Sequence, residues 1–216
     1  GQWFLPSKDE LNELCKIYSN GRTDTIQYAT MQNGCTGSTS PTGGFVTTFF
    51  YFSSSEFSAS AAVDQDFESG IQLYSSKNSG GYVRPVRAFF ASCATGGPCA
   101  VGDAGPGGGT VFYDAGTTQS WGRYLEAAPT DYQVNGSRAR VVWGCQGTPK
   151  GATATAIGTG KANTATILTK CTTDDIAAGV ANKYSTSTAG AGQWFLPSKD
   201  ELNELCKIYS NGRTDT

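Results

Sequence analysis

The chain has 216 residues, of which 38% are hydrophobic and 16% charged, and its formal net charge is −2. This balance offers no basic surface to nucleic acid or anionic lipid, and no apolar run approaches the length of a membrane span. Histidine is absent, which excludes Ser-His-Asp and Cys-His catalysis and every histidine-containing zinc site. Low charge together with 28 glycines is typical of β-rich extracellular bacterial proteins.

The first 25 residues return unchanged at the other end of the sequence, since Gly1–Thr25 is identical to Gly192–Thr216. The offset between Gly1 and Gly192 gives a period of 191 residues, which is the size of a whole domain. Such identity indicates an array of nearly identical units rather than a lone catalyst. A duplicated, tag-like end is the alternative interpretation.

The first predicted element is a helix that starts at the capping box Ser7–Glu10, directly after Pro6. An apolar stripe at helical spacing follows, formed by Leu11, Leu14, Cys15 and Tyr18. Asn20 and Gly21 predict the end of this helix. Residues 198–212 predict the same helix a second time.

Short β-prone runs between Gly and Ser turns follow at residues 45–52, 61–67, 71–74, 82–90, 110–113, 123–127 and 140–143. Pro85 predicts an edge position or a bulge for its strand, and Arg84 and Arg87 are expected at the surface. A sheet with flanking helices and no regular βαβ alternation predicts an α+β fold.

Two more helices are expected between the last strand and residue 192. The first covers about residues 161–170, with Ala162, Ala165 and Leu168 inward. The second covers about residues 174–184 behind a Thr173 cap, with Asp174 and Asp175 compensating the helix dipole in its first turn. Its inward face is formed by Ile176, Val180 and Tyr184.

The chain has seven cysteines, but each repeat unit has six, because Cys206 is the equivalent of Cys15 in the second copy of the repeated segment. The six are Cys15, Cys35, Cys93, Cys99, Cys145 and Cys171. No CxxC pair occurs among them, which favours disulfides in an oxidising compartment over zinc, although some could be free and buried. Six cysteines allow 15 connectivities, and we favour local pairs, including Cys93 with Cys99. Cys206 is then expected to be unpaired.

The glycine-rich stretch 102–109 is the strongest boundary signal in the chain. It predicts four segments: 1–92 as the C-terminal half of one unit, 93–101 as an inter-unit disulfide loop, 102–191 as the N-terminal half of the next unit, and 192–216 as the copy of 1–25. The halves either fold back on each other, as in a circularly permuted domain, or pair with neighbouring sequence. We expect the second arrangement, a string of beads, since 192–216 would be superfluous in a closed permuted domain.

Several motifs together resemble one bacterial family. They are GDAGPGGGTVFY (102–113), LEAAP (125–129), WGC (143–145), IGTGKANTATIL (157–168), WFLPSKDELNEL (194–205), FYFSSSEFSASAAVDQDFESG (50–70) and YVRPVRAF (82–89). They resemble the domain that ends bacterial collagen-like adhesins, a member of the C-type-lectin-like superfamily. Phe50–Phe52 departs from the aromatic-Trp pair usual there.

The resemblance implies a C-type-lectin-like fold with small antiparallel sheets and two or three flanking helices, stapled by disulfides. It also implies a cell-surface or secreted protein, and some relatives attach to glycans. It does not imply an enzyme.

The aromatic run Phe49, Phe50, Tyr51 and Phe52 cannot all face one core, because side chains alternate along a strand. We expect two of them to pack against another unit, together with Trp3 and Trp194. A platform for stacking sugars is the alternative.

Acidic residues suggest two further kinds of site. Asp64 and Asp66 share one strand face, but calcium needs six to eight oxygens, and the superfamily's calcium-dependent sugar motifs are absent. We expect no metal and no cofactor, with a structural calcium ion as the alternative. The carboxylates Glu10, Glu56, Asp64, Asp66 and Glu126 have no spacing that selects a glycosidase pair.

Two loops carry short sequence motifs. The stretch 102–109 lacks the GK[ST] ending of a phosphate-binding loop and predicts a turn. Asn135-Gly136-Ser137 is a glycosylation sequon on a predicted loop.

Together these features predict a structural repeat unit of an extracellular bacterial filament or adhesin stalk, whose units join head to tail. The expected partners are neighbouring copies of the same unit, and neither nucleic acid nor a membrane span is expected. A glycan-binding adhesin module that uses repetition for avidity is the main alternative. A secreted enzyme is the least favoured interpretation.

Overall fold

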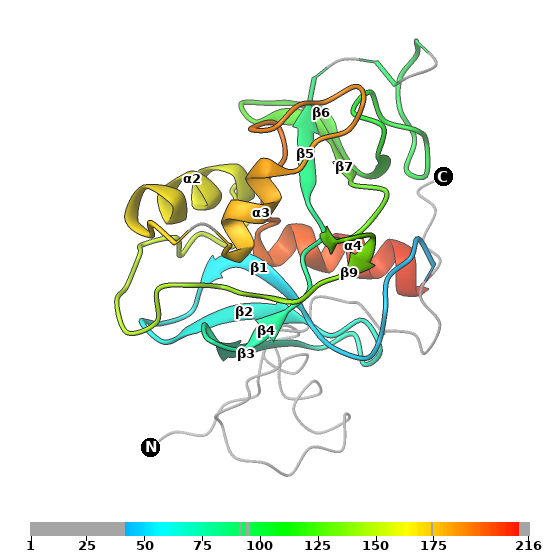
Figure 1. Ribbon diagram of the computed structural model, residues 1–216. Helices are drawn as coiled ribbons and strands as arrows, with labels where there is room; N and C mark the ends of the chain where they lie inside the picture. The colour runs from blue at the N-terminus through cyan, green and yellow to red at the C-terminus, as the bar shows by residue number, and fades with distance from the viewer. Residues whose placement is uncertain (1–41, 91, 94–95, 174, 212–216) are drawn as a thin grey trace, which may run out of the picture.

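The computed structural model of the chain describes residues 42–90, 92–93, 96–173 and 175–211 (Figure 1). Its strands are β1 (Tyr51–Glu56), β2 (Ala61–Gln65), β3 (Gln72–Ser76), β4 (Gly80–Gly81), β5 (Val86–Phe89), β6 (Thr110–Gln119), β7 (Gly122–Ala127), β8 (Gln133–Val134), β9 (Ser137–Arg138) and β10 (Val141–Val142). The helices of this part of the chain are α2 (Gly160–Lys170), α3 (Ala177–Lys183) and α4 (Lys199–Asn211). The predicted α+β class is confirmed.

The strands form small antiparallel sheets. Two have three strands, in the orders β1-β2-β3 and β5-β7-β6, and two are pairs, β10-β4 and β8-β9. Figure 1 shows α4 passing between the two larger sheets, and α4 contacts β1, β2 and β6. Pro85 directly precedes β5, which is an edge strand of its sheet, as the sequence predicts.

The two predicted halves bury a common core within this one chain. In one cluster, Phe45 and Phe67 of the first half pack with Phe112 and Leu125 of the second. In another, Phe52 of the first half packs with Trp143 and Ile167 of the second. The expectation that the halves pair with neighbouring sequence is therefore wrong for the described residues, because each half covers the apolar face of the other.

The second copy of the repeated segment completes this core. The stripe of α4, equivalent to the stripe predicted in the first copy, is buried in the first cluster: Leu202, Leu205, Cys206 and Tyr209. The capping box forms as predicted, since the Ser198 amide donates to Glu201 (2.7 Å) and the Glu201 amide to the Ser198 hydroxyl (3.3 Å). Residues 192–210 thus complete the core, and the first copy lies outside the described residues.

Helix α2 has the predicted length but buries a different face. The buried residues are Gly160, Asn163, Thr164 and Ile167, whereas Ala162 and Ala165 are exposed. Asn163 donates to the Ala154 carbonyl (2.7 Å), and the Leu196 amide donates to the Thr164 hydroxyl (3.0 Å). The expected face is wrong for Ala162 and Ala165, because these hydrogen bonds turn a polar pair toward the core, whereas Leu168 packs against the second core cluster as expected.

Helix α3 is shorter than predicted. It begins at Ala177, its N-cap residue is Ile176, and its first turn has no acidic residue. The expected Thr173 cap and the dipole role for Asp175 are therefore wrong, and Asp174 lies outside the described residues. Ile176 and Val180 are buried as expected.

The structure contains the disulfides Cys93–Cys99 and Cys145–Cys171. Cys206 is also disulfide-bonded, so the expectation that it is unpaired is wrong. Cys15 and Cys35 lie outside the described residues. Among the described helices, none is long and apolar enough to cross a membrane.

Candidate functional site

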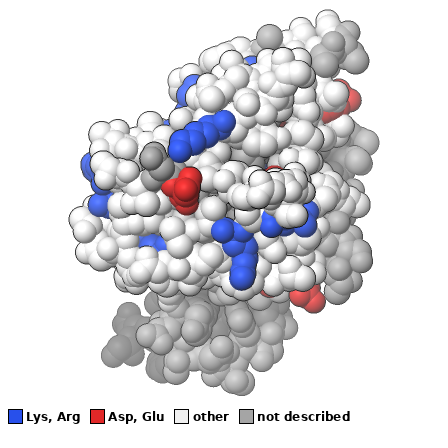
Figure 2. All heavy atoms as spheres, in the orientation of Figure 1, with Lys and Arg blue, Asp and Glu red and all other residues white. Residues whose placement is uncertain are grey.

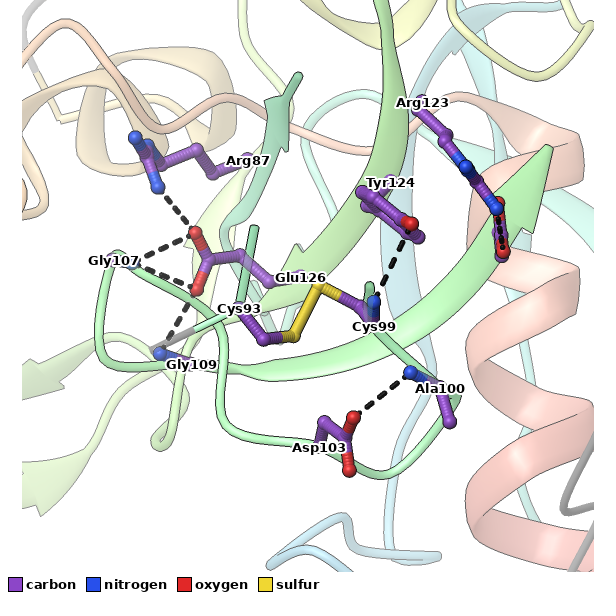
Figure 3. Close-up of a disulfide and its surroundings, with 11 residues drawn as sticks. Arg87, Cys93, Cys99, Ala100, Asp103, Gly107, Gly109, Arg123, Tyr124 and Glu126 are labelled. Atoms are coloured by element: carbon purple, nitrogen blue, oxygen red, sulfur yellow. Dashed lines mark hydrogen bonds and ion pairs between the residues drawn. A yellow bond between two sulfur atoms is a disulfide. The ribbon is translucent and has the colours of Figure 1, made fainter. Parts of the chain in front are cut away.

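Buried carboxylates anchor the loops of this domain, and Glu126 on β7 is the first of them. It accepts hydrogen bonds from the amides of Gly107 (3.0 Å) and Gly109 (3.1 Å) and pairs with Arg87 (Figure 3). A Cβ atom at Gly109 would overlap the Ala127 carbonyl oxygen. The glycine-rich loop does cradle an anion, but that anion belongs to the chain itself.

The disulfide loop lies beside this anchor. Cys93 and Cys99 pack in a small cluster with Phe89, Val111 and Tyr124. The Cys99 amide donates to the Tyr124 hydroxyl (3.4 Å), and the Ala100 amide donates to Asp103 (2.8 Å) (Figure 3). The loop that joins the two halves is therefore held by sulfur and by hydrogen bonds.

Two further glutamates act in the same way. Glu56 accepts from the amides of Lys150 and Gly151 (both 2.8 Å) and pairs with Lys77. Burial opposes ionisation of Glu56, but these hydrogen bonds hold its pKa below the ordinary value. Glu201 accepts from the amides of Ser198 (2.7 Å) and Gly158 (2.8 Å), while its burial raises its pKa to about 7.

Asp131 organises a buried ionic cluster. It accepts from Arg84 (2.6 Å) and from the Tyr51 hydroxyl (2.9 Å), and it pairs with Arg138. Burial and the charge of Asp131 raise the pKa of Tyr51. Arg84 is 1% exposed and lies 3.9 Å from the centre of the Phe45 ring, so its expected surface position is wrong.

The carboxylates considered for glycoside hydrolysis do not converge in the described part of the chain. Glu56 and Glu126 hold different loops. Asp66 caps its own turn, accepting from the Glu68 amide and the Ser69 hydroxyl (both 2.8 Å). Glu10 lies outside the described residues. No group of three or more metal-ligating side chains occurs among the residues searched, which are the described ones.

Asp64 differs from these carboxylates because it lines a pocket. The pocket has a volume of about 220 Å³ and is lined by Thr47, Thr48, Phe49, Phe50, Asp64, Asp66 and Leu73. The antiparallel register places Phe52 and Leu73 on either side of Asp64, on the same face of the β1-β2-β3 sheet.

The Asp64 carboxylate is buried without a hydrogen bond. The residue is 1% exposed, and neither of its oxygens has a hydrogen-bond partner. Burial raises the pKa of Asp64 to about 7, and the charge of Asp66 adds to this rise. Ser75 on β3 opposes the rise without reaching hydrogen-bond geometry. The spacing of Asp64 and Asp66 predicts that both face one side of the strand. Of these two carboxylates, Asp66 has hydrogen-bond donors and Asp64 has none.

The aromatic run divides between the core and this pocket. Tyr51 and Phe52 point to opposite faces of β1 and are fully buried in separate core clusters. Phe49 and Phe50 are partly exposed and line the pocket. Trp194 is fully buried with Ala128 and Ala189, and Trp3 lies outside the described residues. Of the described aromatic residues proposed for inter-unit packing, Phe49 and Phe50 retain exposed surface.

The sequon is well exposed. Asn135 and Gly136 form the turn of the β8-β9 hairpin, with φ angles of 51° and 75°. These values match the two-residue turn that Asn-Gly favours.

The visible surface carries no concentrated charge. Figure 2 shows basic and acidic side chains scattered over this face rather than gathered in one patch. Comparison of the chain with family models, curated proteins and solved structures found no match.

Proposed function

We propose that this chain is a structural repeat unit of an extracellular bacterial filament or adhesin stalk, with a C-type-lectin-like fold and units joined head to tail. The observation that carries the proposal is the position of the repeated segment. Residues 192–210 close the core, and the same sequence also stands at residues 1–19. The described part of the chain therefore has one place for this segment, and the sequence contains the segment twice.

The energetics permit exchange between chains, because both copies can make the same contacts. Burial of a leucine side chain contributes roughly 1.5–3 kcal/mol, so Leu202 and Leu205 anchor the segment strongly. The first copy has leucines at the equivalent positions, Leu11 and Leu14, so it can make the same contacts. A copy not used in its own chain can close a neighbouring chain. Such a contact is heterologous and does not limit the number of units.

Closure within the chain is consistent with this assembly. Residues 42–90 pack on residues 102–210 within this one chain. The Thr42 amide donates to the Tyr209 carbonyl (2.8 Å), so the end of α4 lies beside the start of that half. Two disulfides are typical of the oxidising environment outside the cytoplasm.

The test compares matched variants of the two copies in the full chain. Leu205→Asp disables the second copy and Leu14→Asp the first. We expect the wild type to assemble as its concentration rises and the Leu14→Asp variant to stay at the 22.6 kDa of one chain, measured by light scattering. We expect Leu205→Asp to fold with the first copy in place, and the double variant to unfold.

Two results would contradict the proposal. One is a wild type that remains a single chain at every concentration. The other is a Leu205→Asp variant as unstable as the double variant, because the first copy would then be unable to take the place of the second.

A glycan-binding module is the second candidate, and the partly exposed rings of Phe49 and Phe50 favour it. Flat rings stack on sugar faces, and repetition would add avidity. Glycan-array binding that is lost in Phe49→Ala and retained in Leu14→Asp would support this function over the structural one.

A further inference from the structure

We propose that the pocket beside β1, β2 and β3 binds a primary alkylammonium group, such as a lysine side chain, with Asp64 as its counter-ion. This site is separate from the closing segment and does not depend on how units assemble.

The first argument is the unsatisfied carboxylate. Both oxygens of Asp64 lack hydrogen-bond donors, although the residue is 1% exposed. A buried carboxylate normally has hydrogen bonds or a paired charge, and Glu56, Glu126 and Asp131 in this chain all do. Asp64 lacks such a partner and lines an open pocket, so a ligand with N–H donors and positive charge supplies what the chain does not.

The second argument is the composition of the walls. Phe49, Phe50 and Leu73 form apolar surface that suits an alkyl stem, and ring faces attract a cation. An ammonium group has three N–H donors. Asp64 can take one or two of them, and Thr47 and Thr48 also line the pocket.

The size and the donor set argue against other ligands. At about 220 Å³ the pocket is smaller than the roughly 300–1,000 Å³ of sites for drug-sized ligands, so it suits one small group rather than an oligosaccharide. A calcium ion needs six to eight oxygens. Both oxygens of Asp66 already accept hydrogen bonds within its own turn.

The charged groups around the pocket favour a cation. Asp64 and Asp66 both line it. The opposing charge is Arg140, whose guanidinium lies 4.3 Å from the centre of the Phe49 ring. Because the ligand binds only ionised Asp64, and burial raises the pKa of that carboxyl to about 7, binding strengthens with rising pH.

The experiment titrates the full chain with n-butylammonium at pH 5.5 and 8.5, followed by NMR shifts of the pocket amides. Asp64 is about 3% ionised at the lower pH and almost fully ionised at the higher, so the apparent affinity should rise about 30-fold. Uncharged n-butanol is the matched ligand control. Asp64→Asn should abolish the pH dependence, whereas Asp66→Asn should keep it.

A second measurement does not depend on any variant. The carboxyl carbon shift of Asp64, followed against pH, should show its pKa falling when n-butylammonium is present. Equal binding of n-butanol, an unchanged Asp64 pKa, or no binding of n-butylammonium at pH 8.5 would overturn the proposal. A parallel titration with Nα-acetyl-lysine amide, whose side-chain ammonium is free, identifies the source of the ligand. Tighter binding than n-butylammonium indicates a protein side chain, and equal or weaker binding indicates a free amine.

Discussion

Ionisation of Asp64 should make the folded domain less stable as pH rises. Its pKa is 3.8 when unperturbed and about 7 in the folded protein, where burial disfavours the charged form. The folded state thus binds the proton more tightly than the unfolded state. The corresponding stability is complete below pH 4 and is lost as pH rises through 7. Three pKa units correspond to about 4 kcal/mol.

Asp64→Asn removes this pH dependence. The wild type should therefore lose stability relative to the variant as the pH rises. The difference in the free energy of unfolding, variant minus wild type, should increase by roughly 3 kcal/mol between pH 5 and pH 8.5. Urea unfolding at both pH values measures this difference. Glu201, whose pKa is also raised to about 7, titrates in both proteins, so its effect cancels.

Asp114→Asn provides a control of opposite sign. The hydrogen bonds from Arg123 hold the pKa of Asp114 below its ordinary value, so the stability it contributes is present at neutral pH and lost as pH falls. The reasoning about Asp64 is refuted if the Asp64→Asn difference in unfolding free energy is the same at pH 5 and 8.5.

Three further changes test the anchors of the loops. Gly109→Ala should cost roughly 1–3 kcal/mol in thermal unfolding because the new methyl group meets the backbone of β7, whereas Gly97→Ala, in open space, should change little. Cys171→Ser should cost about 3.5 kcal/mol and Cys99→Ser about 2 kcal/mol, since the first disulfide closes a 26-residue separation and the second a separation of 6; equal losses in chemical unfolding would contradict the loop-closure argument. Glu126→Gln should cost roughly 1–3 kcal/mol by weakening the hydrogen bonds from the Gly107 and Gly109 amides and the pair with Arg87, and an unchanged midpoint of unfolding would show that the clamp adds no stability.

Elements fixed by local patterns were predictable from the sequence. Helix α4 combines an apolar stripe of period 3.6 with a capping box, and both signals lie within its own residues. The β-prone run at residues 45–52 predicts a strand that begins at residue 45, whereas β1 begins at Tyr51. Phe45 leaves the strand direction to stack on Phe67, at 4.3 Å between ring centres, and this contact depends on the tertiary fold.

The candidate site depended on contacts that no local pattern records. Glu56 binds amides that lie 94 and 95 residues further along the chain. Asp64 and Asp66 look equivalent in sequence, yet the turn after β2 saturates Asp66 while β1 and β3 enclose Asp64. The packing of distant segments decides which acidic residue anchors a loop and which one lines a pocket.

The disulfide between Cys93 and Cys99 has a consequence for a domain exposed to proteases. The loop it closes presents Gly96 and Pro98 to solvent, at the junction between the two halves. A nick in that loop would leave the severed ends joined through sulfur, and the shared core would still hold both fragments together. The junction could therefore lose a peptide bond while both halves stay covalently connected through the sulfur atoms.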